Sequence, residues 1–267
     1  MNIILVDTRE VSGKKVSLTE IRAEHIVKVL RSNVGDNVRV GIVGGGRGTG
    51  RILSMSVKYP FEVELELDIC EPVSALSPLD LILALPRPIM LKRILAQVTA
   101  LGVGTIHLIH ANRVEKSFWS AGILCEKEYR VHLLHGLEQA VDTRLPEIRL
   151  HKRFKPFVED YLPSSLAGYD SRILAHPAGD SRLVDLIPGS SGRVVLAIGP
   201  EGGWVDYEVR KFREQGFGVC SMGERILKVD TAVVALHSGI MALREVVTAS
   251  RLKKNQFPGS LNGDCSQ

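Results

Sequence analysis

The sequence has few of the residues from which metal sites and disulfide frameworks are built. It contains only four cysteines, at positions 70, 125, 220 and 265, with no Cys-x-x-Cys pair and no Cys/His cluster. Cysteines scattered in this way have neither the spacing of a zinc site nor the density of a disulfide scaffold. We therefore expect reduced thiols and no bound metal.

Long apolar runs are also missing. No stretch approaches the roughly 20 residues that a membrane-spanning helix requires. The first seven residues, MNIILVD, carry no basic leader and reach an acidic residue too early for a signal peptide. We expect a cytoplasmic protein that makes no use of a membrane.

Several common catalytic and nucleotide-binding motifs are absent. There is no Gly-x-Gly-x-x-Gly after a first strand, no Walker lysine, no Gly-x-Ser-x-Gly and no His-Glu-x-x-His. The glycine-rich stretch 44–50 lacks the Gly-Lys-Ser/Thr ending and the helix of a phosphate loop. It predicts instead a hairpin with a long flexible tip, between strands at 38–43 and 52–57. A nucleotide-dependent oxidoreductase is therefore a distant alternative.

Composition is that of an ordinary soluble protein with one or two domains. The 267 residues are 45% hydrophobic and 24% charged, and the formal net charge is +4. A mildly basic chain suits a polyanionic partner, although many enzymes are equally basic. Composition alone leaves the partner open.

The order of patterns along the chain predicts an α/β protein. Residues 1–70 are β-rich with one helix starting near residue 18, and 61–69 alternates apolar and acidic residues as a half-buried strand does. After a proline-framed linker at 71–78, apolar strand-like runs alternate with helical segments. This alternation predicts a mostly parallel sheet covered by helices. The expected elements are strands at 79–85, 105–109, 146–150, 172–175, 193–198 and 217–221, and helices at about 89–101, 125–141, 206–215 and 231–247.

Two glycine-bearing turns are the most informative feature of the chain. Residues 197–204, AIGPEGGW, and residues 221–227, SMGERIL, each follow an apolar strand-like run and lead toward a helix. In an open α/β sheet, turns of this kind at neighbouring strand ends hold a small ligand. Glycine permits positive φ and a close approach of the backbone to that ligand. The pair predicts a cofactor pocket.

The same residues resemble the RsmE family of ribosomal RNA methyltransferases, of the SPOUT class. The resemblance is strongest over 198–203 and 222–232. It extends to Leu101-Gly102-Val103, to Asn112-Arg113 with Lys116, to Glu138-Gln139 with Arg144, and to residues 24–31 and 34–36 in the amino-terminal part. It implies an enzyme that methylates N3 of a uridine in small-subunit (16S-type) ribosomal RNA, free or in an assembled 30S-type subunit, with S-adenosyl-L-methionine as cofactor. It also implies a homodimer.

The resemblance implies a domain organisation and a set of site residues. Residues 1–72 would form a PUA-like, RNA-binding β-barrel domain and 73–250 a SPOUT domain with a carboxy-terminal trefoil knot, while the polar residues 251–267 suggest a disordered tail. The cofactor-binding residues would be Leu174, Ala175, His176, Ile198, Gly199, Pro200, Glu201, Gly202, Gly203, Met222, Gly223, Ile226, Leu227, Thr231 and Ala232. The catalytic residues would be Arg225, Glu201 and Asp230, and the RNA-binding residues Lys28, Arg31, Arg51, Arg113, Lys116 and Arg144.

Alternatives remain open at this stage. Arg225 is equally suited to a structural ion pair, and Glu201 to holding its loop or capping the following helix. A methyltransferase of the same class with a ribose 2′-hydroxyl as its target, and a non-catalytic RNA-binding assembly factor, fit the same motifs. Product analysis separates the first alternative, and affinity for S-adenosylmethionine separates the second.

Overall fold

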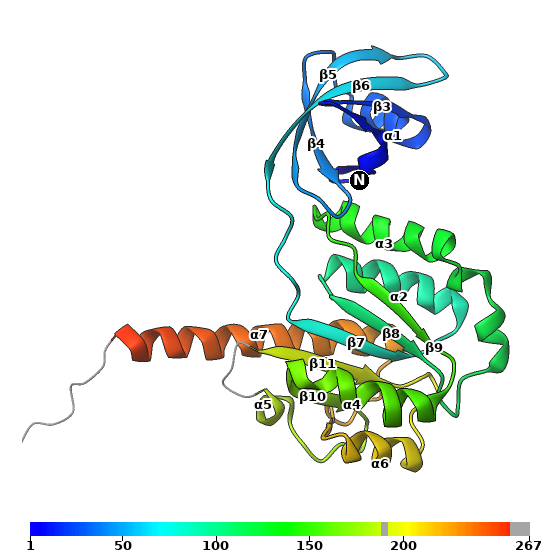
Figure 1. The fold of residues 1–267 in the computed structure, drawn as a ribbon, viewed down its shortest axis with the longest axis vertical. Helices are drawn as coiled ribbons and strands as arrows, with labels where there is room; N and C mark the ends of the chain where they lie inside the picture. Colours follow the sequence, from blue (N-terminus) through cyan, green and yellow to red (C-terminus); the bar gives the residue numbers. More distant parts are fainter. Residues whose placement is uncertain (188–191, 257–267) are drawn as a thin grey trace, which may run out of the picture. The chain divides into compact units, whose positions relative to one another are not determined.

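The computed structural model describes residues 1–187 and 192–256. Their contacts divide the chain into two compact units that are not contiguous in sequence (Figure 1). Unit 1 contains residues 1–77, 87–104 and 120–147, and unit 2 contains residues 78–86, 105–119 and those from 148 onward.

Unit 1 is built on a mixed six-stranded sheet. Its strands are β1 (Ile4–Val6), β2 (Val11–Ser12), β3 (Lys15–Thr19), β4 (Asn37–Ile42), β5 (Arg47–Ser56) and β6 (Glu62–Glu71), in the order β1-β4-β5-β6-β3-β2. Only β1 and β4 pair in parallel. Alternate residues of β3 and β6 are buried, which confirms the half-buried strand expected at 61–69.

A single helical stretch packs on this sheet, and two longer helices complete unit 1. The stretch comprises α1 (Glu20–Glu24) and η2 (His25–Leu30), and it buries Ala23 and Ile26 against Val16, Leu18 and Leu65 of the sheet. The longer helices, α2 (Pro88–Ala100) and α3 (Glu126–Ala140), pack against each other. Short 3-10 turns are η1 (Thr8–Glu10) and η4 (Gly122–Leu124).

The long hairpin tip expected at 44–50 is shorter than predicted. Strand β5 begins at Arg47, so residues 47–50 pair with β4 and β6 rather than forming a loop. A Cβ atom on Gly48 would lie 2.0 Å from the Asp68 carbonyl oxygen. The glycine here allows close strand packing, a role that a sequence reading confuses with loop flexibility.

Unit 2 contains a six-stranded, mostly parallel sheet. Its strands are β7 (Leu79–Ala84), β8 (Thr105–Ile109), β9 (Glu147–His151), β10 (Tyr169–Ala175), β11 (Arg193–Ile198) and β12 (Gly218–Cys220), in the order β12-β10-β11-β7-β8-β9. The pairs β12–β10, β10–β11, β11–β7 and β7–β8 are all parallel. Every residue of β7 is buried, as expected for a central strand covered on both faces. The predicted α/β class with a mostly parallel sheet is confirmed.

Short helices and one long helix accompany this sheet. They are η3 (Lys116–Ser120), η5 (Pro156–Tyr161), α4 (Leu162–Ser165), η6 (Leu166–Gly168), α5 (Leu183–Leu186), α6 (Asp206–Glu214) and α7 (Val229–Gln256). Helix α6 runs against β12. Helix α7 runs against β11 and α5 (Figure 1). Helix α7 continues past Val247, so the first six residues of the expected tail are helical. The rest of that tail, 257–267, lies outside the described residues.

Candidate functional site

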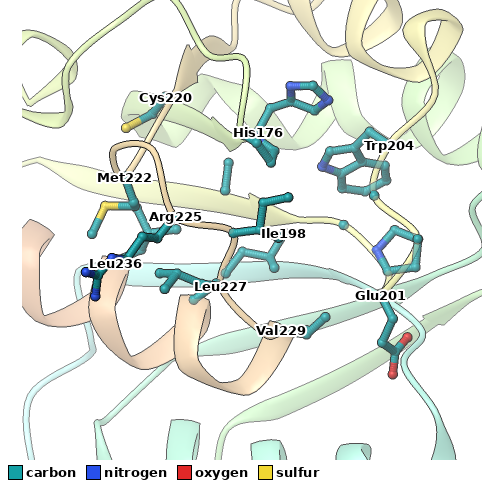
Figure 2. Close-up of a pocket in the computed structure, with 18 of the residues that line it drawn as sticks. His176, Ile198, Glu201, Trp204, Cys220, Met222, Arg225, Leu227, Val229 and Leu236 are labelled. Atoms are coloured by element: carbon teal, nitrogen blue, oxygen red, sulfur yellow. The ribbon is translucent and has the colours of Figure 1, made fainter.

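A pocket of about 260 Å³ opens at the carboxyl edge of the parallel sheet in unit 2 (Figure 2). Strands β10, β11 and β12 all end at this edge, because they run in parallel. The pocket walls come from the segments that follow these strands and from the first turns of α7. This is the position in which open α/β sheets bind ligands.

The first glycine turn of the sequence forms one wall. Gly203 has a φ of +75° and its N–H donates to the Pro200 carbonyl over 2.8 Å, which closes a tight turn. Gly199 lies against the indole of Trp204, where a Cβ atom would be 3.1 Å from the ring nitrogen. Trp204 is buried, so a side chain at residue 199 would require the indole or the turn to shift by a few tenths of an ångström.

The second glycine turn forms the opposite wall. Gly223 has a φ of +96°, and its N–H donates to the Ser221 hydroxyl oxygen over 3.2 Å. A side chain there would be strained by its backbone conformation. Met222 and Ile226 of this turn are exposed apolar side chains at the pocket, 42% and 83% accessible. This wall therefore combines exposed apolar side chains with one cation, Arg225.

All but two of the predicted cofactor-binding residues line this pocket. Leu174 is completely buried inside β10, where it pairs with Ala197 of β11. Thr231 is exposed in the first turn of α7 and does not line the pocket. These two residues flank segments that do form the walls. A sequence motif does not distinguish a residue that lines a pocket from one that lies next to the lining.

Sequence reasoning missed further residues of the wall, which are Pro177, Trp204, Cys220, Val229 and Leu236. A signal for three of them was present. Val229, Ala232 and Leu236 are spaced i, i+3 and i+7, which places them on one face of the helix that follows the second turn. Trp204 directly follows the first glycine turn.

The three predicted catalytic residues are not brought together. Glu201 and Arg225 both line the pocket, but they lie on opposite sides and the Glu201 carboxylate points away from it (Figure 2). Asp230 is 7% exposed and does not line the pocket. Its Oδ1 accepts the Thr231 N–H over 3.0 Å, so this carboxylate stands at the amino-terminal end of α7, where negative charge stabilises a helix.

A buried glutamate holds the first glycine turn in place. Glu208 is 2% exposed, and its carboxylate accepts the N–H of Val205 over 3.0 Å and the N–H of Asn112 over 2.7 Å. Arg113 donates to the Gly202 carbonyl. The loop after β8 is thereby joined to the loop after β11. Glu208 lies three residues after the amino-terminal cap of α6, but the cap residue is Val205, so the sequence carried no capping-box signature.

The thiol at the pocket is not prepared to act as a nucleophile. Burial raises the pKa of the Cys220 thiol above its ordinary value. A cysteine reacts as a thiolate, so this shift favours the inert protonated form near neutral pH. Cys220 therefore serves as an apolar wall residue.

Half of the predicted RNA-binding residues are engaged within the protein. Lys28 forms an ion pair with Glu24 over 2.7 Å, and Arg144 donates from Nε to the Ser74 carbonyl over 2.7 Å. Arg113 is bound to the first glycine turn, as described above. The other three, Arg31, Arg51 and Lys116, are exposed.

Metal sites and membrane spans are two further features that a fold can carry. Within residues 1–187 and 192–256, no group of three or more His, Cys, Asp or Glu side chains is placed to hold a metal ion. None of the helices found there combines the length and apolar character that crossing a bilayer requires.

Comparison with known proteins places these features in a family. Residues 74–241 match the family described as RNA methyltransferase domain. Ribosomal RNA small subunit methyltransferase E of Treponema pallidum is 34% identical over 250 residues, which cover 91% of each chain. Ribosomal RNA small subunit methyltransferase E 1 of Borreliella burgdorferi is 26% identical, over 94% of this chain and 99% of its own.

Solved structures have the same fold. Ribosomal RNA small subunit methyltransferase E from Neisseria gonorrhoeae, solved with S-adenosyl methionine bound, superimposes with a TM-score of 0.69. It is 21% identical, over 91% of this chain and 98% of its own. A probable rRNA methyltransferase from Porphyromonas gingivalis also gives a TM-score of 0.69, over 91% and 99% of the two chains. The chain belongs to the ribosomal RNA small subunit methyltransferase E family.

Proposed function

We propose that this protein transfers a methyl group from S-adenosyl-L-methionine to N3 of a uridine in small-subunit ribosomal RNA. The observation that carries the proposal is the pocket formed by the two glycine turns. It lies at the ligand-binding edge of the sheet, and most residues that the family resemblance assigned to the cofactor line it.

The pocket residues suit a nucleoside cofactor. Ile198, Leu227 and Leu236 offer apolar surface to a purine ring or an alkyl chain. The glycine turns expose backbone N–H and C=O groups at the edge of that surface. Ligands that combine an apolar ring with hydrogen-bonding groups are recognised by this kind of site. When bound, S-adenosylmethionine supplies an electrophilic methyl group on a sulfonium centre.

The chain must then position a uracil and help its N3 proton to leave. An in-line transfer depends on alignment, and alignment is what rigid loops supply. We assign Arg225 to stabilising the negative charge that develops on the uracil, because it is the cationic residue that lines the pocket. Glu201 is the carboxylate that lines the pocket, and we propose it as proton acceptor after a rotation of its side chain. We assign Asp230 an indirect role, because it does not line the pocket. Its carboxylate stabilises the amino-terminal end of α7, whose first turns form part of the cofactor wall.

The finer features implied by the resemblance form part of the same proposal. They are a PUA-like RNA-binding barrel at 1–72, a SPOUT domain at 73–250 with a carboxy-terminal trefoil knot, a homodimer and a cytoplasmic location. The antiparallel hairpins of unit 1 are compatible with the barrel, and the parallel sheet of unit 2 is compatible with the SPOUT domain. Val233, Leu236 and Ile240 of α7 are already buried within the chain, so the dimer rests on the family resemblance alone.

Nucleoside mass spectrometry on ribosomal RNA tests the proposal. RNA from cells that lack the protein should contain one 3-methyluridine fewer in the small subunit than RNA from wild-type cells. Purified protein with S-adenosylmethionine should restore it, and Arg225→Ala should abolish the restoration while the protein stays folded and binds the cofactor. The negative charge that develops on the attacking uracil would then have lost its stabilising group.

The alternatives predict different results. A 2′-O-methylated nucleoside in place of 3-methyluridine would reassign the enzyme to a ribose target. No binding of S-adenosylmethionine in a calorimeter would contradict the proposal and favour an assembly factor. Unchanged turnover of Arg225→Ala would remove the role assigned to that residue.

A further inference from the structure

A strongly basic segment follows strand β9 in unit 2 and is not among the RNA-binding residues that the sequence suggested. Residues 149–155, RLHKRFK, contain four Lys or Arg residues and one histidine, and no acidic residue. We propose that Lys152, Arg153 and Lys155, which we call the basic strip, bind the phosphate backbone of RNA beside the pocket. The inference rests on the proposed function, because it names a binding surface for the same substrate class.

The charges of the basic strip are available to a ligand. All three side chains are exposed, and none has an ion-pair partner among residues 1–187 and 192–256. Lys28 and Arg144, by contrast, already have partners within the protein. A charge that is not neutralised internally is the one that gains most from a polyanion.

The topology brings the basic strip to the edge of the sheet that carries the pocket. The Glu147 N–H donates to the Gly104 carbonyl at the start of β9, and the His110 N–H donates to the His151 carbonyl at its end. These two hydrogen bonds show that β9 runs parallel to β8, and β8 is parallel to β7 and β11 in turn. The segment after β9 therefore leaves the sheet at the same edge as the glycine turns.

An aromatic chain fixes the basic strip at this position. Phe154 lies between Arg153 and Lys155, and its ring centroid is 5.8 Å from that of Phe212 on α6. The Phe212 ring is 5.2 Å from Trp204, which forms part of the pocket wall. Phe212 is fully buried, so Phe154 is anchored on the core while its two cationic neighbours face solvent. Only two ring contacts separate the basic strip from the pocket.

The surroundings favour an RNA strand over an uncharged ligand. Glu159, an acidic residue on the helix that follows, is already neutralised by Lys211 over 3.1 Å. Flexible cations in a row bind phosphates without reading base identity, which positions a strand rather than selecting it. The basic strip would thus hold backbone next to the uridine that enters the pocket.

Salt-dependent RNA binding by the intact protein tests this inference. The probe is a fluorescein-labelled single-stranded RNA oligonucleotide, and fluorescence anisotropy gives its affinity between about 50 and 200 mM salt. Lys152→Gln with Lys155→Gln should make the negative slope of log K against log salt shallower by about 1.4. Each lost phosphate contact removes about 0.7 from the slope for single strands. If the variant and the wild type bind equally at about 1 M salt, this slope difference makes the variant bind about 25-fold more weakly at about 0.1 M salt.

Two matched variants serve as controls. Lys92→Gln with Lys127→Gln removes the same charge from two exposed lysines of unit 1 that form no ion pair among the described residues, and it should bind like the wild type. Lys152→Arg with Lys155→Arg keeps the charge and should retain the wild-type slope. An unchanged salt slope for Lys152→Gln with Lys155→Gln would overturn the inference. An equal change of slope for Lys92→Gln with Lys127→Gln would overturn it too.

The same proteins separate this inference from the proposed function. The glutamine pair at positions 152 and 155 should bind S-adenosylmethionine in a calorimeter as tightly as the wild type, because neither lysine lines the pocket. If wild-type protein fails to methylate ribosomal RNA while the slope still falls, the basic strip stands and the proposed function fails. If methylation is found and the slope does not change, the reverse holds.

Discussion

At the scale of single residues, the buried Asp80 shows how a charge is accommodated in the core of unit 2. It is completely buried at the start of β7, where it accepts the Thr105 N–H over 2.6 Å. Tyr169 and Arg193 donate to its other oxygen. A buried carboxylate is tolerated only with such partners, and removing one of them leaves the charge poorly compensated. The cluster lies at the amino-terminal ends of the strands, away from the edge that carries the pocket.

Because of this cluster, we expect the free energy of unfolding to depend on pH under alkaline conditions. Burial and the hydrogen bond to Asp80 raise the pKa of Tyr169 above its ordinary value. Above about pH 10 the unfolded chain loses the tyrosine proton while the folded protein keeps it, so the free energy of unfolding falls as pH rises. The fall should be at most about 1.4 kcal/mol per pH unit from this residue.

Urea unfolding at a neutral and an alkaline pH measures the effect. Tyr169→Phe should be less stable than the wild type at neutral pH, because Asp80 loses a donor. The difference between the two proteins should narrow in alkali. If the gap stays constant with pH, Tyr169 is not the group responsible.

At the scale of elements, a glycine sets the distance between helices α2 and α3 of unit 1. A Cβ atom on Gly136 would lie 2.4 Å from the Ala96 carbonyl oxygen and 2.7 Å from the Thr99 Cβ. Gly136 is buried, and backbone cannot move aside as a flexible side chain can. The two helices therefore approach as closely as they do only because residue 136 has no side chain.

We expect Gly136→Ala to destabilise unit 1 by about 1–3 kcal/mol, the usual cost of overpacking. Gly122→Ala is the matched control, because a Cβ atom at that position meets nothing within 4 Å. Its stability should be close to that of the wild type. Chemical denaturation followed by circular dichroism measures both, and equal stabilities would show that the helices can shift apart without cost.

At the scale of the whole molecule, the pocket should couple ligand binding to folding. Its walls come from segments that follow three strands and from α7, so a ligand that binds there holds together parts far apart in sequence. Binding only to the folded state stabilises it by mass action. The glycine turns carry exposed apolar residues such as Ile226, and these have the most to gain from a ligand.

S-adenosylmethionine at about 100 times its Kd should stabilise the protein by about 2.7 kcal/mol, and NADH should not. Thermal unfolding with each ligand tests this, and the fluorescence of Trp204 in a Trp119→Phe background gives an independent reading of the pocket. A shift with NADH and none with S-adenosylmethionine would point back to the oxidoreductase alternative.

The sequence predicted those parts of the fold that local patterns encode. The apolar runs at 105–109 and 193–198 are strands with these very bounds, and the charged segment at 206–215 is a helix that ends one residue earlier. Burial on one face or on two faces leaves a period in the sequence, so it can be read directly. The tip of the hairpin at 44–50 was misread, because glycine serves close strand packing and flexible loops alike.

The site was predictable to the extent that it consists of continuous turns. The segments after β11 and β12 were identified from their glycines, and the structure places them at one pocket. Glu208 was missed, because its role depends on which segments the sheet order brings together, whereas Trp204 and Leu236 lie close in sequence to the two turns and could have been found. The same order decides that Arg113 contacts Gly202, and that Arg144 contacts Ser74 within unit 1.

The sequence by itself determined the α/β class, the family and the two turns that form the pocket, since each rests on residues adjacent in the chain. Only the tertiary structure decided which cations are neutralised and which remain available. Arg113 and Arg144 looked suited to RNA and have partners within the protein, whereas Lys152, Arg153 and Lys155 passed unnoticed and have no ion pair among the described residues. A charge is visible in the sequence, but the partner that engages it can come from a distant part of the chain, and only folding brings the two together.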